Sequence, residues 1–410
     1  MIKRQIILFD DHSHTNLLPL TFTRPVAQIR IGILRISEKW QHHIALPISY
    51  LTAPYLQPLY PPRFEADNLL LNGSILPDAP LVQAIKSLQI NEALVNDKTI
   101  IAFRTKHTLS KQQIAQLQVP DADTFEVIAA YRQKQYPLPY TKINQVWDIF
   151  QKNNVALQLD FDLLTKNRNS QIVSSSNQII APENVFLEQG ASVEASFLDA
   201  SKGPIYVGKN ATIMAGSLIQ GGLAVCDNAT VKMGAKIYAT TTIGPYCNVA
   251  GEVKGSILFE RTNKGHDGFL GDAVLGEWCN LGADTNCSNL KNNYSNVKLW
   301  NYAANDYADS GLLKCGLIMG DHSKCSINTM FNTGTVVGVC SNIFGADFPP
   351  KFIPSFSWGG GNKWADYHWD KALQTIQTVY GRKNKALLDK EIQVLSRIFE
   401  RTKTHRSNEK

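Results

Sequence analysis

The chain has 410 residues and a mass near 45.6 kDa, which is too long for one small domain and suits two or three. Apolar residues make up 44% of it, enough to bury a large core, so wholesale disorder is excluded. Lysine and arginine number 41 against 35 acidic residues, a net charge of +6 without long basic runs, which argues against a nucleic-acid partner. No stretch approaches about 18 consecutive apolar residues, so we predict no membrane partner.

The first residues, MIKRQIILFDD, hold only a short apolar run before two aspartates, which predicts a first strand and not a signal peptide. The seven cysteines include no CxxC pair. They indicate small, reduced core residues of a cytosolic protein, so we predict a cytoplasmic location.

Residues 1–150 alternate short apolar runs (IILF, LLLN, TIIAF) with helical stretches such as LVQAIKSLQ and KQQIAQL. This pattern predicts an α/β domain. Residues 151–180 are assigned as a connector to the part that follows.

A repeat of six residues dominates the next part of the chain. Every sixth residue is isoleucine or valine over a run of eight: Val207, Ile213, Ile219, Val225, Val231, Ile237, Ile243 and Val249. Neither a strand nor a helix has this period, whereas a parallel β-helix stacks every sixth residue inward on the next coil. We therefore predict a β-helix domain over residues 181–350.

The frame fits Leu187 and Val193 upstream and resumes downstream at Phe269, Leu275 and Leu281, and then at Met319, Cys325, Phe331, Val337 and Ile343. Two spans, 256–268 and 286–316, break it and are predicted to be loops leaving one edge, where function usually lies. Residues 351–410 begin with a loop. Apolar residues at three- and four-residue spacing then predict two amphipathic helices that cap the β-helix, with a break near Gly381.

The polar residues around the first break suggest acyl transfer. His266 lies between Gly265 and Asp267, and a neutral imidazole there can take a proton from an amine nucleophile. The alternative is that His266 is a surface histidine with no catalytic function. The following segment is rich in asparagine, including Asn280 and Asn289, which either form turns or hold sugar hydroxyls. Lys298 suits a phosphate, unless it is simply a solvated lysine.

The segment FDDHSHTNLLPLTFTRP follows the first strand, the usual place for a nucleotide phosphate in α/β proteins. No glycine lies between residues 1 and 31, so a glycine-rich phosphate loop is absent. His12 and His14 are weak candidates for metal ligands, and Asp10 and Asp11 either end the strand or hold Mg²⁺. The metal ligands are left unassigned.

The run around His266 resembles the bifunctional UDP-N-acetylglucosamine pyrophosphorylase/glucosamine-1-phosphate N-acetyltransferase family, whose motif is GHxxYLGDxxIGxxVNIGAGT followed by CNY. The matching run here is GHDGFLGD, then LG, then CNLGA. The resemblance implies a trimeric left-handed parallel β-helix, with His266 as the catalytic base and Asn280 and Asn289 at the sugar. Phe269 replaces the tyrosine after the histidine, and Leu290 replaces the tyrosine of CNY.

The N-terminal half resembles the nucleotidyltransferase opening LxAGxGTRLxPLTxTRPKP. Thr15 and Arg24 match motif positions, and Asn72 and Gly73 match the NGD motif, so the resemblance assigns these four residues to the nucleotide. His12 and His14 replace the two glycines, and Ser74 replaces the aspartate that supplies a Mg²⁺ ligand. We therefore predict a nucleotidyltransferase-like α/β domain that binds a nucleotide weakly or unusually.

Together these motifs indicate a cytoplasmic homotrimeric transferase for sugar-nucleotide biosynthesis, supplying cell-envelope precursors. The resemblance implies acetyl transfer from acetyl-CoA to glucosamine-1-phosphate, followed by uridylyl transfer from UTP with Mg²⁺ if the first domain is active. Two alternatives stay open. One is a nucleotidyltransferase that uses the β-helix only as a scaffold for oligomers, and the other is a non-catalytic protein that binds a sugar nucleotide.

Overall fold

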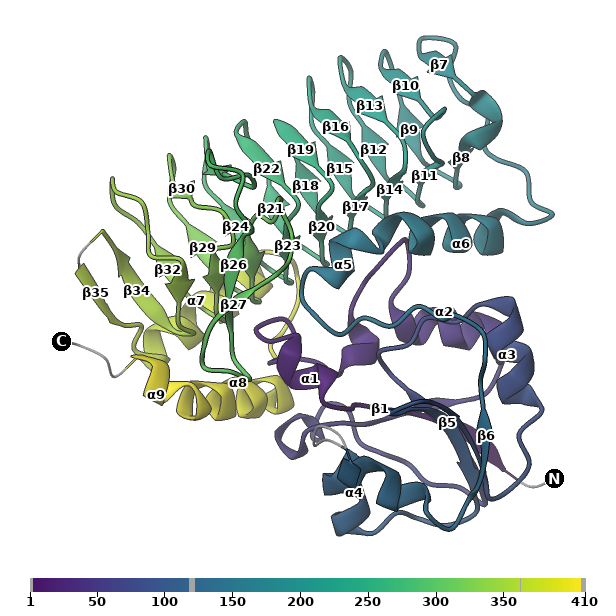
Figure 1. Ribbon diagram of the computed structural model, residues 1–410. Coiled ribbons are helices and arrows are strands. Elements are labelled where there is room, and N and C mark those ends of the chain that lie inside the picture. Colours follow the sequence, from purple (N-terminus) through teal and green to yellow (C-terminus); the bar gives the residue numbers. More distant parts are fainter. Residues whose placement is uncertain (1–2, 118–121, 362, 407–410) are drawn as a thin grey trace. The chain divides into compact units, whose positions relative to one another are not determined.

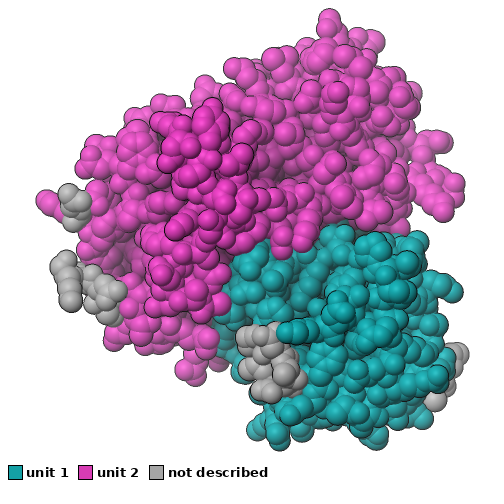
Figure 2. All heavy atoms as spheres, in the orientation of Figure 1, with its two compact units in different colours: residues 1–17, 23–29, 34–145 teal, residues 18–22, 30–33, 146–410 magenta. Residues whose placement is uncertain are grey.

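The computed structural model describes residues 3–117, 122–361 and 363–406 (Figure 1). The chain divides into two compact units, coloured separately in Figure 2. Unit 1 comprises residues 1–17, 23–29 and 34–145, and unit 2 comprises residues 18–22, 30–33 and 146–410. No helix among the described residues is long and apolar enough to cross a bilayer.

Unit 1 is built on a mixed six-stranded sheet of order β2-β1-β3-β5-β4-β6, which confirms the predicted α/β domain. The strands are β1 (Arg4–Phe9), β2 (Ile48–Leu51), β3 (Asp67–Asn72), β4 (Glu92–Asn96), β5 (Thr99–Thr105) and β6 (Arg132–Gln135). β1 lies parallel to both β2 and β3, so the chain changes direction across β1. The carboxyl end of β1 is therefore a topological switch point, where open α/β sheets bind ligands.

Short helices connect these strands. They are α1 (Ser13–Asn16), α2 (Ile36–His43), α3 (Ala79–Lys86) and α4 (Lys111–Leu117), with the 3₁₀ segments η1 (Val26–Gln28), η2 (Pro54–Leu56) and η3 (Ala122–Ile128). α3 begins at Ala79, with Pro80 in its first turn, after Asp78, whose carboxylate accepts the Leu81 amide at 2.8 Å. Such a cap satisfies one of the free amides of the first turn.

The long stretch of unit 2 that starts at residue 146 opens with α5 (Asp148–Gln151) and α6 (Asn153–Thr165), of which α6 lies inside the predicted connector. The short segment 30–33 is held by α6, because Asp160 accepts the Ile33 amide at 2.7 Å and Asn153 accepts the Gly32 amide at 2.7 Å. Thr242 of the β-helix donates to the Gly32 carbonyl at 2.9 Å. The segment 30–33 is thus joined to the second unit, to which residues 18–22 also belong.

The β-helix has three sheets, and their neighbouring strands are parallel, as predicted, except for the last pair of the third sheet, which is antiparallel. The first sheet contains β7 (Gln178–Ile180), β10 (Phe197–Asp199), β13 (Leu218–Gln220), β16 (Lys236–Tyr238), β19 (Glu252–Lys254), β22 (Phe269–Gly271), β25 (Asn286–Cys287) and β30 (Met330–Phe331). The second contains β8 (Val185–Leu187), β11 (Ile205–Val207), β14 (Leu223–Val225), β17 (Thr241–Ile243), β20 (Ile257–Leu258), β23 (Val274–Leu275), β28 (Ile318–Met319), β31 (Val336–Val337) and β33 (Phe352–Ile353), with η4 (Pro182–Asn184) before it. The third contains β9 (Ser192–Val193), β12 (Thr212–Ile213), β15 (Thr230–Val231), β18 (Asn248–Val249), β21 (Asn263–Lys264), β24 (Asn280–Leu281), β29 (Lys324–Cys325), β32 (Asn342–Ile343), β34 (Ser357–Gly360) and β35 (Lys363–Asp366).

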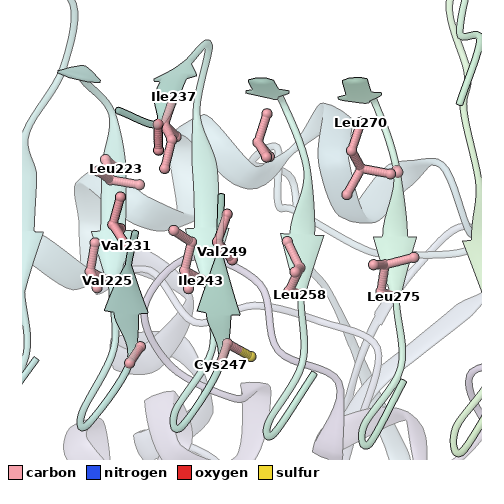
Figure 3. Packing of buried hydrophobic residues seen from close by; sticks show 14 of the residues in the cluster. Leu223, Val225, Val231, Ile237, Ile243, Cys247, Val249, Leu258, Leu270 and Leu275 are labelled. Carbon is pink, nitrogen blue, oxygen red and sulfur yellow. The ribbon is translucent and has the colours of Figure 1, made fainter. Parts of the chain in front are cut away.

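The predicted inward residues stack on one another inside the coils (Figure 3). Val225, Val231, Ile237 and Ile243 are each fully buried, and each strand pairs in register with the equivalent strand of the next coil. The cysteines predicted to be core residues are all buried. The core is thus continuous along the solenoid.

Two details of the predicted frame are wrong. The span 256–268 is not an excursion, because β20 and β21 continue the coil through it. The inward residue of β22 is Leu270, whereas Phe269 points outward. Both errors have one cause, a shorter coil: Val225 pairs with Ile243 after 18 residues, whereas Ile243 pairs with Leu258 and Val249 with Lys264 after 15. Lys264 also occupies an inward position where an aliphatic residue was expected.

The second predicted break is a real insertion. It leaves the coil after β25 and forms the antiparallel hairpin of β26 (Lys298–Asn301) and β27 (Asp306–Asp309). Trp300 of this hairpin stacks on Phe352 of β33 with ring centroids 4.1 Å apart. The insertion is therefore fixed to a later coil.

The predicted C-terminal helices are confirmed as α7 (Trp369–Gly381) and α8 (Asp389–Arg401), followed by α9 (Lys403–Arg406). Tyr380 of α7 stacks on Trp278 of the β-helix, with ring centroids 4.3 Å apart. The hydroxyl of Tyr380 donates to Glu391 of α8 at 3.2 Å. One tyrosine therefore joins both helices to the coil.

Candidate functional site

His266 is exposed in the short turn between β21 and β22. The turn is tight at Gly268, whose φ is 112° and where an added Cβ would lie 2.2 Å from the Thr285 carbonyl oxygen of the next coil. Only glycine fits such a conformation and such an approach. The sequence thus presents the imidazole to solvent from a turn that is packed against the rigid solenoid.

Lys264 lies two residues before this histidine and is only 1% exposed. Its ammonium donates to the carbonyl of His266 and to that of Asp267, the latter at 3.0 Å. Burial lowers the pKa of the Lys264 ammonium to about 8, against the opposing influence of the nearby Asp267 and Asp284 carboxylates. The sequence analysis missed this residue, although the interrupted step of six was a signal for it.

Asparagines line one side of the same corner. Asn263 of β21 pairs in register with Asn280 of β24, and the Asn263 amide donates to the Asn280 side-chain oxygen at 2.9 Å. An added Cβ on Gly265 would lie 2.8 Å from the Asn263 side-chain oxygen. The predicted sugar ligand Asn280 is therefore linked through Asn263 to the turn that carries His266.

The side chains of Phe269 and Asn289 lie close together over Gly271 of β22. An added Cβ on Gly271 would lie 2.6 Å from the Phe269 ring and 2.7 Å from the Asn289 amide nitrogen. Asn289 donates to the Asp272 carboxylate at 2.6 Å, which fixes its orientation. The Lys254 ammonium lies 3.9 Å from the same carboxylate.

Lys298, the predicted phosphate ligand, lies on hairpin strand β26 with an exposed side chain, and its carbonyl accepts from Lys351 at 2.8 Å. The structure thus places His266, Asn280, Phe269 and Asn289 on neighbouring coils, with His266 before β22 and Asn289 beside Gly271 at the end of β22. The contacts given for the described residues do not join Lys298 to them.

Unit 1 contains a cavity of about 260 Å³ at the carboxyl ends of β1 and β3. It is lined by Phe9, Asp11, His12, Asn72, Lys98, Thr99, Ile100, Thr124, Lys142 and Asn144. The site lies at the topological switch point of the sheet, with two lysines and one carboxylate among its walls.

Asp11 is the most connected group of this cavity. Its carboxylate accepts from Lys142 at 2.7 Å, from the Asn72 amide at 2.9 Å, and from both the backbone amide and the hydroxyl of Ser13. Burial alone would raise the pKa of Asp11, but the Lys142 ammonium and these hydrogen bonds lower it to about 2. The carboxylate is therefore ionised at neutral pH.

The neighbouring Asp10 has a structural setting instead. Its carboxyl accepts the Val26 amide at 2.9 Å and the Thr52 hydroxyl at 2.5 Å. Burial raises the pKa of Asp10 to about 7. It lies outside the set of cavity-lining residues and ties the segment after Pro25 to the sheet.

The four predicted nucleotide ligands are placed differently from one another. Asn72 lines the cavity, and Gly73 follows it with its amide donating to the Phe9 carbonyl at 2.8 Å. Thr15 is exposed on α1 and Arg24 is 3% exposed, and neither is among the residues that line the cavity. The two lysines of this cavity, Lys98 and Lys142, are distant in sequence from the matched motif and were missed for that reason.

A Mg²⁺ ion does not fit this donor set. Magnesium takes carboxylate oxygens, but both oxygens of Asp11 already accept two hydrogen bonds each, one of them from an ammonium. Ser74, at the position of the family's aspartate, donates its hydroxyl to Asn72 at 2.6 Å. Among the described residues, no group of three histidine, cysteine, aspartate or glutamate side chains is placed to hold a metal ion.

Comparison with known proteins matches residues 6–169 to a family model described as sugar nucleotidyl transferase. The chain is 26% identical over 225 residues to the bifunctional protein GlmU of Synechococcus elongatus, covering 49% of this chain and 45% of that protein. It is 36% identical over 87 residues to the GlmU of Methanocaldococcus jannaschii, covering 21% of each. The chain thus spans less than half the length of these curated relatives.

Two solved structures are also similar. One is the polySia specific acetyltransferase NeuO, at 13% identity and a TM-score of 0.22, with 47% of this chain and 81% of that chain covered. The other is the UDP-N-acetylglucosamine O-acyltransferase LpxA of Moraxella catarrhalis, at 13% identity and a TM-score of 0.21, with 56% and 97% covered. Neither TM-score supports an inference about the chemistry of this chain.

Proposed function

Because this chain is a GlmU-like family member, we propose that it acts in sugar-nucleotide biosynthesis as a transferase. Its β-helix would transfer the acetyl group of acetyl-CoA to the amine of glucosamine-1-phosphate. The observation that carries this proposal is the exposed His266, held on a packed turn that directly follows the Asn263–Asn280 pair. Asn289 lies beside Gly271, at the other end of β22.

His266 acts as the general base. The amine of an amino sugar is largely protonated at neutral pH and attacks a thioester only after losing a proton. A neutral imidazole accepts that proton while the nitrogen attacks the thioester carbonyl carbon. The C–N bond forms, the C–S bond breaks, and the thiolate of CoA leaves and is protonated.

The neighbouring side chains orient the acceptor sugar. Asn280 uses its side-chain oxygen to accept from Asn263, so its amide nitrogen is the group that donates to a sugar hydroxyl. The Asn289 side chain is oriented by its hydrogen bond to Asp272 and lies with the Phe269 ring over Gly271. Lys298 would meet the sugar phosphate only from the hairpin.

The turn that carries His266 is exposed in a single chain. A neighbouring subunit of a homotrimer would therefore complete the acetyl-CoA site. A closed three-fold ring satisfies every such interface at once. Light scattering should then give about three times the chain mass of 45.6 kDa. A monomer at micromolar concentration would contradict the shared site.

The direct test is His266→Ala. A positioned base is worth roughly 10²–10⁴ in rate, so kcat for acetylated product, measured by mass, should fall by that factor with little change in KM. The matched control is His107→Ala, an exposed histidine of unit 1, which should leave the rate unchanged. Near-full activity of His266→Ala would leave the β-helix as a scaffold.

The cavity of unit 1 favours a second activity, uridylyl transfer from UTP to N-acetylglucosamine-1-phosphate. Without a glycine-rich loop, the phosphates would be bound by Lys142 and Lys98, with Asn72 as a polar partner. Lys142 would exchange Asp11 for a phosphate oxygen as the nucleotide enters. No step is assigned to a metal ion.

Lys142→Ala tests this placement. Losing a charged hydrogen-bonding partner should lower the rate of UDP-N-acetylglucosamine formation about 10–100-fold, while acetyl transfer persists. Lys86→Ala, at an exposed lysine of α3, is the control. Brisk uridylyl transfer in Lys142→Ala would remove the nucleotide from this cavity. If the unaltered protein binds the sugar nucleotide but forms neither product, the non-catalytic alternative holds.

A further inference from the structure

Lys264 is a buried cation inside the β-helix. It pairs in register with Val249 of the preceding coil and lies at the same level of the third sheet as the inward residues Leu281 and Cys325. These neighbours are apolar or weakly polar, and the lysine side chain is among the largest fully buried ones. A charge at such a position is strongly unfavourable unless the fold supplies partners for it.

The partners are the two backbone carbonyls of the turn that follows. The Lys264 ammonium donates to the His266 and Asp267 carbonyls, which lie two and three residues further on. The Asp267 and Asp284 carboxylates and the Cys325 thiol also face the ammonium, close enough to act on it electrostatically. The turn is therefore folded back over the end of a side chain that reaches it from within the core.

We propose that Lys264 is a positioning residue for acetyl transfer, and that its ammonium fixes the backbone that carries His266. This rests on the proposed role of His266 as the base. Gly265 and Gly268 let the backbone of the turn fold back over the ammonium, and the two hydrogen bonds from the core then hold the backbone beside the imidazole. A misplacement of a base by about 1 Å costs on the order of 10²-fold in rate.

The test is Lys264→Met in the full chain. Methionine keeps the length of the side chain and suits the apolar stack, but it cannot donate to the carbonyls. We expect an unchanged or higher melting temperature, because a buried charge is removed. We also expect kcat for acetyl transfer to fall about 10–100-fold with little change in KM.

The turn itself gives a readout that needs no activity. Asp267 is exposed, and endoproteinase Asp-N cleaves before aspartate. Cleavage between His266 and Asp267, followed by mass, should be at least about tenfold faster in Lys264→Met. The matched control is Leu281→Met, which introduces the same residue at the neighbouring inward position and should change neither cleavage nor kcat.

The outcomes are distinct. Unchanged cleavage of Lys264→Met would overturn the proposal, because the lysine would then not hold the turn. Faster cleavage with an unchanged kcat would show that Lys264 holds the turn but would refute its role in catalysis, while His266→Ala separately decides whether His266 is the base. If Lys264→Met fails to fold, Lys264→Gln, which keeps a donor on a shorter side chain, should give intermediate cleavage and kcat. Wild-type values there would overturn the proposal.

Discussion

The β-helix and the sheet of unit 1 place their polar residues by different means. In the β-helix each coil repeats the last, so Asn263 and Asn280 lie side by side because they occupy neighbouring coils. In unit 1 the cavity joins Asp11 to Lys142, residues 131 apart in sequence. A local repeat positions the first site, whereas long-range strand order positions the second.

This difference predicts how far the destabilising effect of a single substitution extends through the structure. A solenoid coil contacts only its neighbours, so a defect is felt locally through the stack. A charge network across a mixed sheet joins segments that are distant in sequence, so its loss destabilises all of them. The following predictions test this contrast, beginning with the largest effect.

Ile219→Asp should unfold the β-helix. Ile219 is 2% exposed and lies between Leu198 and Ile237 in the inward stack. An unpaired charge there costs several kcal/mol. Circular dichroism during urea denaturation measures the loss.

The adjacent residue gives the control. Leu218 points outward with 52% exposure, so Leu218→Asp should leave the unfolding midpoint nearly unchanged. Equal destabilisation by both changes would contradict the inward and outward alternation of β13.

Asp11→Asn should destabilise unit 1 by about 1–3 kcal/mol, because Lys142 loses its carboxylate partner in a largely buried site. The pKa of Asp11 is lowered to about 2, so this stability is present above pH 4 and is lost as the pH falls toward 2. The deficit of the variant, measured by urea denaturation, should therefore shrink between pH 4 and pH 2.

Asp97→Asn is the matched control, since Asp97 is exposed in the turn between β4 and β5 with φ of 45°, which asparagine tolerates. It should change the free energy of unfolding little at any pH. A deficit of Asp11→Asn that stays constant down to pH 2 would refute the ion pair as its cause.

The smallest effect is a pH dependence in the β-helix. Burial lowers the pKa of Lys264 from 10.5 to about 8, so the unfolded chain holds more protons between these values. The free energy of unfolding should therefore rise with pH in this window, by at most about 1.4 kcal/mol per unit from this group. The difference between the unaltered protein and Lys264→Met isolates it from Lys324 and Lys351, whose pKa values burial also lowers. A difference that does not change from pH 8 to 10.5 would show that Lys264 is not buried as a charge.

The sequence by itself determined the β-helix, because the inward position recurs every six residues and each recurrence is visible as an aliphatic letter. It also determined the C-terminal helices and the α/β character of the first unit, since these follow from local periodicity. His266, Asn280 and Asn289 were assigned from the motif around them and stay predictions. The repeat was misread from residue 256 to residue 270, where the coil is shorter and the inward residue Lys264 is charged, with backbone carbonyls as partners that no sequence pattern shows.

Only the tertiary structure decided the cavity of unit 1. Lys142 and Asp11 meet because β1 is an interior strand and the chain after β6 returns to the carboxyl end of β1. This contact depends on the order of the strands and not on the spacing of residues in the sequence. Strand order also left Arg24 buried outside the residues that line the cavity, although its motif match was clear. Local repeats are readable because their partners are near in sequence, whereas a site built from distant segments depends on contacts that exist only after folding.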